Sequence, residues 1–373
     1  MHRRDFVLTA GLAATVAATI RASLAQEADG PATRDGVLAT QRMRRSARAF
    51  LASLSDEQRR TVIFPLNAGE RTQWSNLPVA NVPRVGLSMG DLDDRGRREV
   101  HALLRASASS QGYLKMAAIM QHDDLLRASE LAYLAHNPPK PKAGRQSVES
   151  MGSGNYWIAF FGDPTADEPW GWLFTGHHLG ATFTVAGGSV AFLPLFVGAD
   201  PNQIEDGPYV GTQVLSHEAR RGFELLHALN DTQRATAVVS PDTIDMAGVG
   251  RENSLTRFEG LPASALDTDQ QRLLWALVEE YVRNTDFAAA DAQIEAIKSA
   301  GIDKLFFSWR GPVDDPTAPF YYRVHGPRIL IEYAVQEPNH IHTITRDPSN
   351  DYGTDWLGIH YQEHAYGGGK RPT

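Results

Sequence analysis

The 373-residue sequence contains no cysteine. Its absence rules out disulfides, together with zinc, iron–sulfur and blue-copper centres that depend on cysteine ligands. A chain of this length can bury a core large enough to fold without disulfides. Any metal that the protein binds must therefore be held by nitrogen and oxygen donors.

Basic residues are outnumbered: 36 Lys and Arg stand against 44 Asp and Glu, which gives a formal net charge of −8. No run of basic residues is long enough to form a patch for phosphate groups. We therefore expect no nucleic-acid partner.

The N-terminus has the pattern of a twin-arginine export signal. Arg3 and Arg4 are followed by a spacer and Phe-Val-Leu. The apolar stretch 6–20 is shorter than the about 20 residues that span a bilayer, and small residues before position 26 predict cleavage after Ala25. We expect a signal peptide at 1–25, recognition by the twin-arginine export machinery, and a periplasmic or extracellular protein with no membrane span after cleavage. This route carries folded cargo, often with a cofactor already inserted, which favours a bound metal or organic group.

The remaining chain is interpreted as one domain, 26–373, of the α+β class. Helical periodicity predicts a helical layer over about 35–135, and the proline-rich stretch that follows predicts a surface linker at 137–147. In the sheet-containing part, 150–373, we expect a mainly antiparallel β-sheet flanked by helices. The predicted strands cover 156–161, 170–185, 190–197, 305–309, 321–325, 329–335 and 340–346, and the predicted helices there cover 216–228, 231–239 and 268–282.

A short helix-start signature occurs four times, beginning at Leu54, Leu92, Leu229 and Leu266. Each copy places Ser, Asp or Asn at a helix N-cap, and three place Gln three residues later, as in a capping box. The similar spacing within the first and last pairs is consistent with duplication of a helical unit. Four well-capped helices would produce the same pattern, and we favour that interpretation.

Histidines in the predicted strands are the main candidates for chemistry. His340 and His342 are two residues apart, so both side chains point to the same sheet face, about 6.5–7 Å apart along the strand. His177 and His178 lie in another predicted strand, where their rings should point to opposite faces. One of these two rings, with His340 and His342, could complete a three-histidine site with an open position for water or substrate. The alternative is a polar sheet face of hydrogen-bonded histidines.

Further candidates follow in the C-terminal part. Glu332 interrupts an apolar run, so its carboxylate needs a metal, a His or an Arg as partner. His325 lies at a strand end, and His360 is one helical turn before His364. Asp347 and Asp351 follow the histidine strand and could orient a metal-bound histidine or act as a base. We therefore expect Glu332, His325, Asp347 and Asp351 as catalytic candidates, and His177, His178, His340, His342 and His360 as metal ligands.

Several motifs together make the chain similar to a known family, domain-of-unknown-function family 3500. The residues that carry the resemblance are Trp74–Pro78, Gln111–Lys115, Trp170–Trp172, Gly176–Leu179, Phe196–Pro201, Tyr322–Pro327, Ile331–Tyr333, Asn339–Thr343, Arg346–Pro348 and Asp351–Gly353. The resemblance covers nearly all of the chain after the signal and implies a single domain. It implies no activity, because the family is named for lacking one.

Our leading hypothesis is an exported metal-dependent hydrolase that acts on a small polar substrate. A divalent ion, with zinc placed first and iron, manganese or copper as alternatives, would activate bound water. With iron or copper the same site would suit an oxidoreductase. A different class of function is a non-catalytic periplasmic protein that binds an aromatic or sugar ligand through Tyr156, Trp157, Trp170, Trp172 and Trp309.

Overall fold

The structure is a computed structural model that describes residues 34–137, 143–248, 251 and 254–363, with only the backbone at residues 143 and 359–363. The predicted signal peptide, 1–25, and His364 lie outside the described residues. None of the helices in the described part has both the length and the apolar character needed to cross a membrane.

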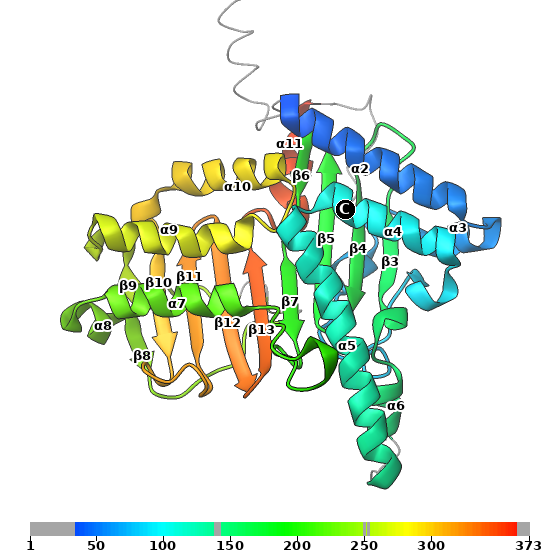
Figure 1. Ribbon diagram of the computed structural model, residues 1–373. Helices are drawn as coiled ribbons and strands as arrows, with labels where there is room; N and C mark the ends of the chain where they lie inside the picture. Colours follow the sequence, from blue (N-terminus) through cyan, green and yellow to red (C-terminus); the bar gives the residue numbers. More distant parts are fainter. Residues whose placement is uncertain (1–33, 138–142, 249–250, 252–253, 364–373) are drawn as a thin grey trace, which may run out of the picture.

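A 13-stranded sheet runs through the described part of the chain (Figure 1). Its strands are β1 (Ile63–Phe64), β2 (Leu87–Ser88), β3 (Trp157–Phe161), β4 (Trp170–Gly176), β5 (Leu179–Ala186), β6 (Ser189–Ala191), β7 (Leu195–Ala199), β8 (Val238–Ser240), β9 (Leu261–Pro262), β10 (Phe306–Arg310), β11 (Tyr321–Gly326), β12 (Ile329–Glu337) and β13 (His340–Arg346). The main path is β1-β3-β4-β5-β7-β13-β12-β11-β10-β8, and β2, β6 and β9 pair with β3, β5 and β10. Only the β1–β3 and β8–β10 pairs are parallel.

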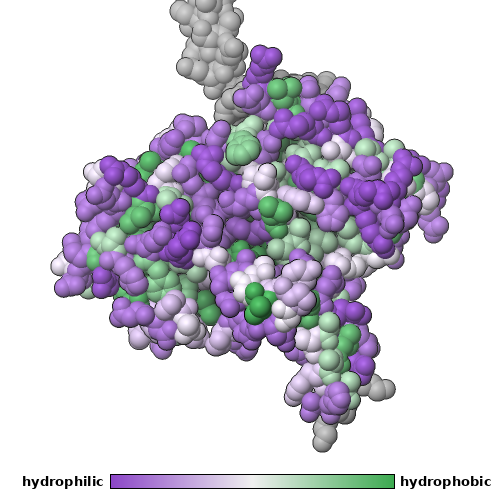
Figure 2. All heavy atoms as spheres, viewed as in Figure 1, coloured by the Kyte–Doolittle hydropathy of each residue, from purple (hydrophilic) through white to green (hydrophobic). Residues whose placement is uncertain are grey.

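One face of the sheet, which we call the helix face, is covered by helices (Figure 1). The α-helices of the described residues are α2 (Arg34–Ser53), α3 (Asp56–Val62), α4 (Asp94–Ser107), α5 (Ser110–His136), α6 (Ala143–Glu149), α7 (Ser216–Ala228), α8 (Asp231–Ala237), α9 (Thr268–Val282), α10 (Phe287–Ala300) and α11 (Thr354–Glu363). The outer surface of this layer is mainly hydrophilic (Figure 2). The predicted α+β class is confirmed.

The opposite face, which we call the loop face, is covered by irregular segments. Trp74 and Val85 come from the chain between β1 and β2, and Met246 comes from the chain between β8 and β9. These side chains pack with Phe196 of β7 and Ile344 of β13 in a second, smaller core. Because neighbouring strand residues point to opposite faces, each central strand contributes to both cores.

The element order of the first half of the chain recurs in the second half. The elements α2, α3, β1, β2, α4, α5, β3, β4, β5 and β7 are matched in turn by α7, α8, β8, β9, α9, α10, β10, β11, β12 and β13. The strand order is mirrored about the β7–β13 pair. Gly86 and Gly260, which precede β2 and β9, both have positive φ and lie against the strand carbonyl oxygens of Ile158 and Phe307. The chain therefore folds as two related halves that share one sheet.

The four predicted helix caps are confirmed. Ser55, Asp93, Asn230 and Asp267 each accept a hydrogen bond from a backbone amide, and three of the caps form complete capping boxes with Gln. Ser55 and Asn230 begin the equivalent helices α3 and α8, and Asp93 and Asp267 begin the equivalent helices α4 and α9. The caps are thus related in pairs between the two halves, in contrast to our preferred interpretation of four unrelated caps.

Three features differ from the sequence prediction. Residues 143–147 of the predicted linker belong to helix α6, which begins just after the prolines at 138, 139 and 141. The short strands β1 and β2 lie in the predicted helical layer yet join the sheet through β3. The predicted strand 170–185 is two strands, β4 and β5, which pair with each other.

Candidate metal centre

His177 and His178 form the turn between β4 and β5. Gly176 pairs with Leu179, so only the two histidines connect the strands. The prediction that they lie inside a strand is wrong. Aromatic and β-branched residues flank the turn on both sides, so the sequence around it resembles one continuous strand. His178 has φ 61°, a left-handed conformation that is uncommon for a residue other than glycine. Its amide donates to Asn76 O at 3.3 Å, and its carbonyl accepts from the Gly198 amide at 2.8 Å.

His340 and His342 lie on β13 with their side chains on the loop face. His342 is paired with Gly198 of β7, next to the β4–β5 turn. Their Nε2 atoms are 3.1 Å apart, as expected when residues two apart on a strand share a face. The turn that carries His178 meets the same strands through the Gly198 amide.

The structure brings three histidines together. His340 Nε2 lies 3.0 Å from His178 Nε2 and 3.1 Å from His342 Nε2. The candidate ligand atoms of all three residues lie within 4.8 Å of one another, so His178, His340 and His342 can hold a metal ion. We call this group the histidine triad.

Gly198 provides the space in which two of the rings meet. A Cβ atom at this position would lie 3.1 Å from both His178 Cδ2 and His342 Cδ2. Most Cβ atoms do not approach a neighbour so closely, so an alanine would displace both rings. Phe196, two residues earlier on the same face of β7, packs edge-on against His342 with ring centroids 5.5 Å apart.

Burial favours the neutral, metal-binding form of His178 and His340. His178 and His342 are buried, and His340 is partly exposed. Burial lowers the pKa of His178 well below its usual value, and the neighbouring histidines lower it further. Burial, with His342 and His177 nearby, lowers the pKa of His340 to about 4. Unprotonated imidazole is the form that coordinates metal ions.

Carboxylates lie behind two of the three rings. Asp200 Oδ2 is 3.8 Å from His340 Nδ1, and Asp245 Oδ1 is 3.8 Å from His342 Nδ1. These distances are too long for hydrogen bonds, but a small side-chain rotation would bring each carboxylate within reach. A carboxylate on the far nitrogen orients a metal-bound histidine and raises its basicity.

His177 has a different partner from His178. Its Nδ1 lies 2.6 Å from Asp123 Oδ1, and the other carboxylate oxygen of Asp123 accepts from the Gly152 amide at 2.7 Å. The His177 and His178 rings lie face to face, with centroids 3.8 Å apart and an interplanar angle of 31°. His177 is therefore held beside the triad by α5, and it is not among the three residues whose ligand atoms converge.

The other sequence candidates have partners elsewhere. The Glu332 carboxylate accepts from the Tyr321 hydroxyl at 2.7 Å and from the Ala247 amide. His325 packs against Phe258, with ring centroids 4.4 Å apart. None of these contacts is with the triad.

Asp347 and Asp351 also form structural contacts. Asp347 accepts from Arg328 and from Gln293, and Asp351 accepts from Arg346 at 3.1 Å. His360 lies in α11, and its side chain is outside the described residues. The roles that we expected for these residues thus have no support from the contacts of the described part.

Three acidic residues beside the site were not predicted from the sequence. Asp200 lies within the Phe196–Pro201 motif, which was the one available signal. Asp123 lies in the long helix α5, and Asp245 lies in an irregular segment, so neither has a local pattern that points to the histidines. Only tertiary contact reveals them.

A family model described as "Protein of unknown function (DUF3500)" matches residues 38–354. The chain belongs to this family. The match includes all three triad histidines, and it confirms the resemblance that the motifs indicate. No curated protein and no solved structure matches the chain. The family carries no assigned activity, so arguments about function rest on the geometry of the triad.

Proposed function

We propose that this protein is an exported metal-dependent enzyme, a hydrolase for a small polar substrate, whose ion is bound by His178, His340 and His342. The single observation that supports the proposal is the convergence of three Nε2 atoms. A neutral imidazole nitrogen either donates one proton or accepts one at a single lone pair. His340 Nε2 can therefore form only one good hydrogen bond, yet it lies 3.0 Å and 3.1 Å from two other Nε2 atoms.

One metal ion would satisfy all three nitrogens. In a tetrahedral site with Zn–N bonds of about 2.0–2.1 Å, nitrogen ligands are roughly 3.3 Å apart. The two distances from His340 Nε2, 3.0 Å to His178 and 3.1 Å to His342, are close to this spacing. Three histidines with a fourth position for water are a known ligand set of catalytic zinc.

Zinc is our first choice among the divalent ions. Non-haem iron oxygenases use two histidines and one carboxylate, whereas the carboxylates here lie behind the rings. An iron, manganese or copper ion at the triad remains the alternative, and with iron or copper the enzyme would be an oxidoreductase. A bound zinc ion would lower the pKa of its water and so supply a nucleophile near neutral pH.

The chain contributes orientation and access. Asp200 and Asp245 would hold the His340 and His342 rings through Nδ1. His177, fixed by Asp123, would present a fourth imidazole beside the ion, where it could exchange a proton with the substrate. The side chain of His340 is 24% exposed, which leaves one side of the triad open to a substrate.

Export by the twin-arginine route is part of the proposal. The metal site joins distant segments and so exists only in the folded chain; an ion inserted before export therefore needs a route that carries folded cargo. The binding-protein alternative receives no such support. Tyr156, Trp170, Trp172 and Trp309 are at most 1% exposed and belong to the core, so their faces cannot stack on a ligand.

The proposal is tested by metal analysis of protein purified without a histidine tag. Asn tolerates positive φ, so His178→Asn removes a ligand while it preserves the turn. Wild-type protein should contain about one metal ion per chain, and His178→Asn and His342→Asn should contain almost none. The matched control is the double variant His177→Asn/Asp123→Asn, which removes the neighbouring pair and should keep its metal.

Two results would overturn the proposal. Wild-type protein that binds no ion after reconstitution with zinc, manganese, iron(II) and copper(II) would exclude the metal site. Equal metal content in the wild type and in a folded His178→Asn variant would exclude the triad. Zinc-loaded protein that cleaves none of a panel of activated esters, amides and phosphate esters would contradict the hydrolase assignment alone.

A further inference from the structure

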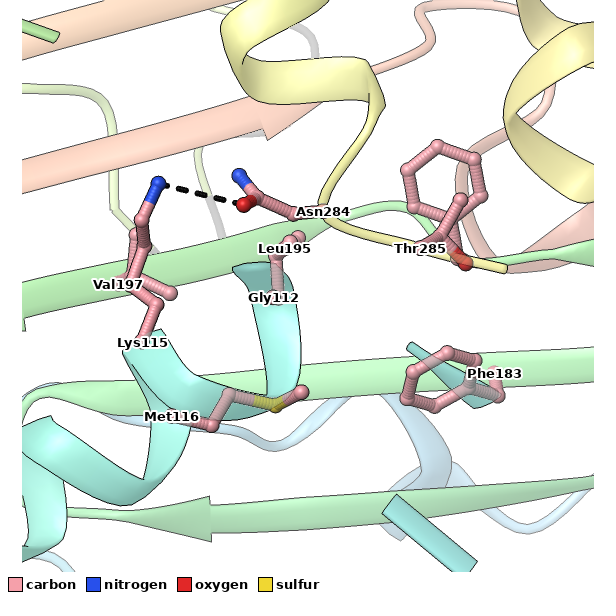
Figure 3. A pocket seen from close by; sticks show the side chains of 9 residues that line it. Gly112, Lys115, Met116, Phe183, Leu195, Val197, Asn284 and Thr285 are labelled. Carbon is pink, nitrogen blue, oxygen red and sulfur yellow. Dashed lines mark hydrogen bonds between the residues drawn. The ribbon is translucent and has the colours of Figure 1, made fainter. Parts of the chain in front are cut away.

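A buried charged cluster lies on the helix face, at the motif Gln111–Lys115 that the metal site does not explain. The Lys115 ammonium forms a short ion pair with Glu218 Oε1. It also lies 3.2 Å from Asn284 Oδ1 and 3.8 Å from Glu280 Oε1. Figure 3 shows Lys115 on α5 and its hydrogen bond to Asn284. Glu218 and Asn284 therefore accept two of the three ammonium protons, and Glu280 interacts with the ammonium only through charge.

The carboxylates of the cluster retain acceptors that no protein group uses. Glu218 is fully buried, and its Oε2 has no hydrogen-bond partner among the described residues. Burial raises the pKa of this carboxyl, and the Lys115 ammonium opposes that shift. Glu280 Oε1 accepts from the Gln111 amide at 2.6 Å, whereas Glu280 Oε2 has only His217 nearby, at 4.0 Å. Two carboxylates thus face one ammonium. A buried acceptor without a partner is unfavourable, and the cluster lacks a second positive charge to balance its two carboxylates.

A cleft of about 300 Å³ opens beside this cluster. It lies between the N-terminal part of α5, the start of α7 and the end of α9. Lys115, Glu218, Glu280 and His217 form its polar wall, and Leu114 forms part of its apolar wall. Leu114 is 64% exposed, so the cleft is accessible from solvent. This volume is at the lower end of the range for small-molecule sites.

We propose that this cleft binds a small organic cation, an ammonium or guanidinium group with a short apolar tail. The cation pairs with Glu280 in the cleft wall and supplies the positive charge that the two carboxylates lack, and the tail packs against Leu114. Lys115 does not attract an anion, because its charge is paired with Glu218 and a second carboxylate, Glu280, lies beside it. The site is separate from the histidine triad, which lies on the loop face, so it does not depend on the proposed metal.

The probes are three molecules that share one tail: butylammonium, butanol and butyrate. Binding to the full protein is measured by calorimetry and ligand-observed NMR at fixed ionic strength. Butylammonium should bind roughly tenfold more tightly than butanol, as expected for charge-assisted hydrogen bonds in place of neutral ones. Butyrate should bind no better than butanol.

The variants separate charge from shape without disturbing the core. Leu114→Lys places a positive charge at the mouth of the cleft and should weaken butylammonium binding roughly tenfold. Leu114→Gln, of similar size and neutral, should keep most of it. Glu280→Gln, whose fold is checked by circular dichroism, should also weaken binding. The variant His178→Asn should bind as the wild type does.

Three outcomes would overturn the proposal. Tighter binding of butyrate than of butylammonium would indicate an anion site on Lys115. Equal affinity for butylammonium and butanol would indicate an apolar cleft without charge recognition. Equal butylammonium affinity in the wild type and Leu114→Lys would show that the cation binds elsewhere on the acidic surface.

Discussion

Neighbouring aspartates illustrate how burial and partners decide what an acidic residue does. Asp347 accepts from Arg328 and Gln293 and ties the β11–β12 turn to the end of β13. Asp351 accepts from Arg346 and from the Asp347 amide. Burial raises the pKa of Asp351 to about 6, although Arg346 opposes this shift. In the sequence, both residues were candidates for a catalytic base. In the fold, both form ion pairs and hydrogen bonds that connect neighbouring segments.

The raised pKa of Asp351 predicts a specific dependence of stability on pH. The folded carboxyl, with its pKa of about 6, keeps its proton over a range where the unfolded one, near 3.8, has lost it. The contribution of Asp351 to the free energy of unfolding therefore falls as pH rises from about 4 to 6, by on the order of 2–3 kcal/mol in all. Asp351→Asn should remove this fall.

The measurement is urea unfolding of the wild type and of Asp351→Asn at pH 4, 5, 6 and 7. As pH rises from about 4 to 6, the unfolding free energy of the wild type should fall relative to that of Asp351→Asn. Other titrating groups cancel in the difference. Asp94→Asn serves as control, because the Asp94 side chain is 84% exposed on α4. Parallel pH curves for the wild type and Asp351→Asn would contradict the prediction.

At the scale of helices, two capping boxes are joined to each other. Gln233 and Gln270 each close the capping box of their own helix, α8 and α9. Their side-chain amides also pair reciprocally, at 2.8 Å and 2.9 Å. In the first half Gln58 closes the equivalent box of α3, but position 96, which corresponds to Gln270, is glycine. The capping box therefore has a second glutamine as partner in α8 and α9, but a glycine at the corresponding position beside α3.

This difference predicts unequal costs for the same substitution. Gln270→Ala removes the capping contact and also breaks buried hydrogen bonds to Gln233 and to the Ala228 carbonyl. Its cost should be about 2–3 kcal/mol of unfolding free energy. Gln58→Ala, which removes a more exposed capping contact, should cost about 0.5–1 kcal/mol. Urea unfolding at pH 7 measures both, and equal costs would show that the amide pair contributes nothing.

Local signals in the sequence predict some elements and miss others. The helices 216–228 and 268–282 and the strand 340–346 match α7, α9 and β13 in both bounds. Their periodicities are encoded within the segments themselves, and α9 also has its own capping box. The two- and three-residue strands β1, β2, β8 and β9 were not predicted, because they form only by pairing with distant strands. Helix α10 was also missed.

The same limit applies to the candidate site. The shared face of His340 and His342 follows from the two-residue period of a strand. The choice between His177 and His178 does not, because they form a turn in which Asp123 holds one ring and the triad includes the other. The acidic neighbours Asp200 and Asp245 come from separate segments. Contacts between distant residues, which no local pattern encodes, determine these features.

At the scale of the whole molecule, the two halves use equivalent positions differently. The β4–β5 turn in the first half holds His177 and His178, and the equivalent β11–β12 turn holds Pro327 and Arg328. Arg328 forms an ion pair with Asp347 at 2.9 Å, so the second half uses its turn for structure. The triad takes its turn residue from the first half and its strand residues from the second. A functional metal site therefore requires that both halves be docked.

The docking surface includes a second junction on the helix face. The turn before α5 pairs with the turn before α10 through Ala108 and Thr285. The Ser109 amide donates to Asn284 O at 3.2 Å. Gly112, in the first turn of α5, lies so close that an added Cβ would be 1.8 Å from Asn284 O. The contact is between the backbone of Gly112 and the backbone of Asn284. Neither backbone can move without shifting one half against the other.

Gly112→Ala should therefore destabilise the whole molecule, although alanine favours an isolated helix by about 1 kcal/mol. We expect a net loss of about 3 kcal/mol or more in the free energy of unfolding, from the steric conflict at the junction. Gly69→Ala is the control, because nothing lies within 4 Å of an added Cβ there, and it should change stability by less than about 0.5 kcal/mol. Metal affinity should fall in Gly112→Ala and not in Gly69→Ala, since the triad joins the halves that the substitution pushes apart. A Gly112→Ala protein with wild-type stability and metal affinity would show that the two halves can separate at the helix face while the central strand pair remains intact.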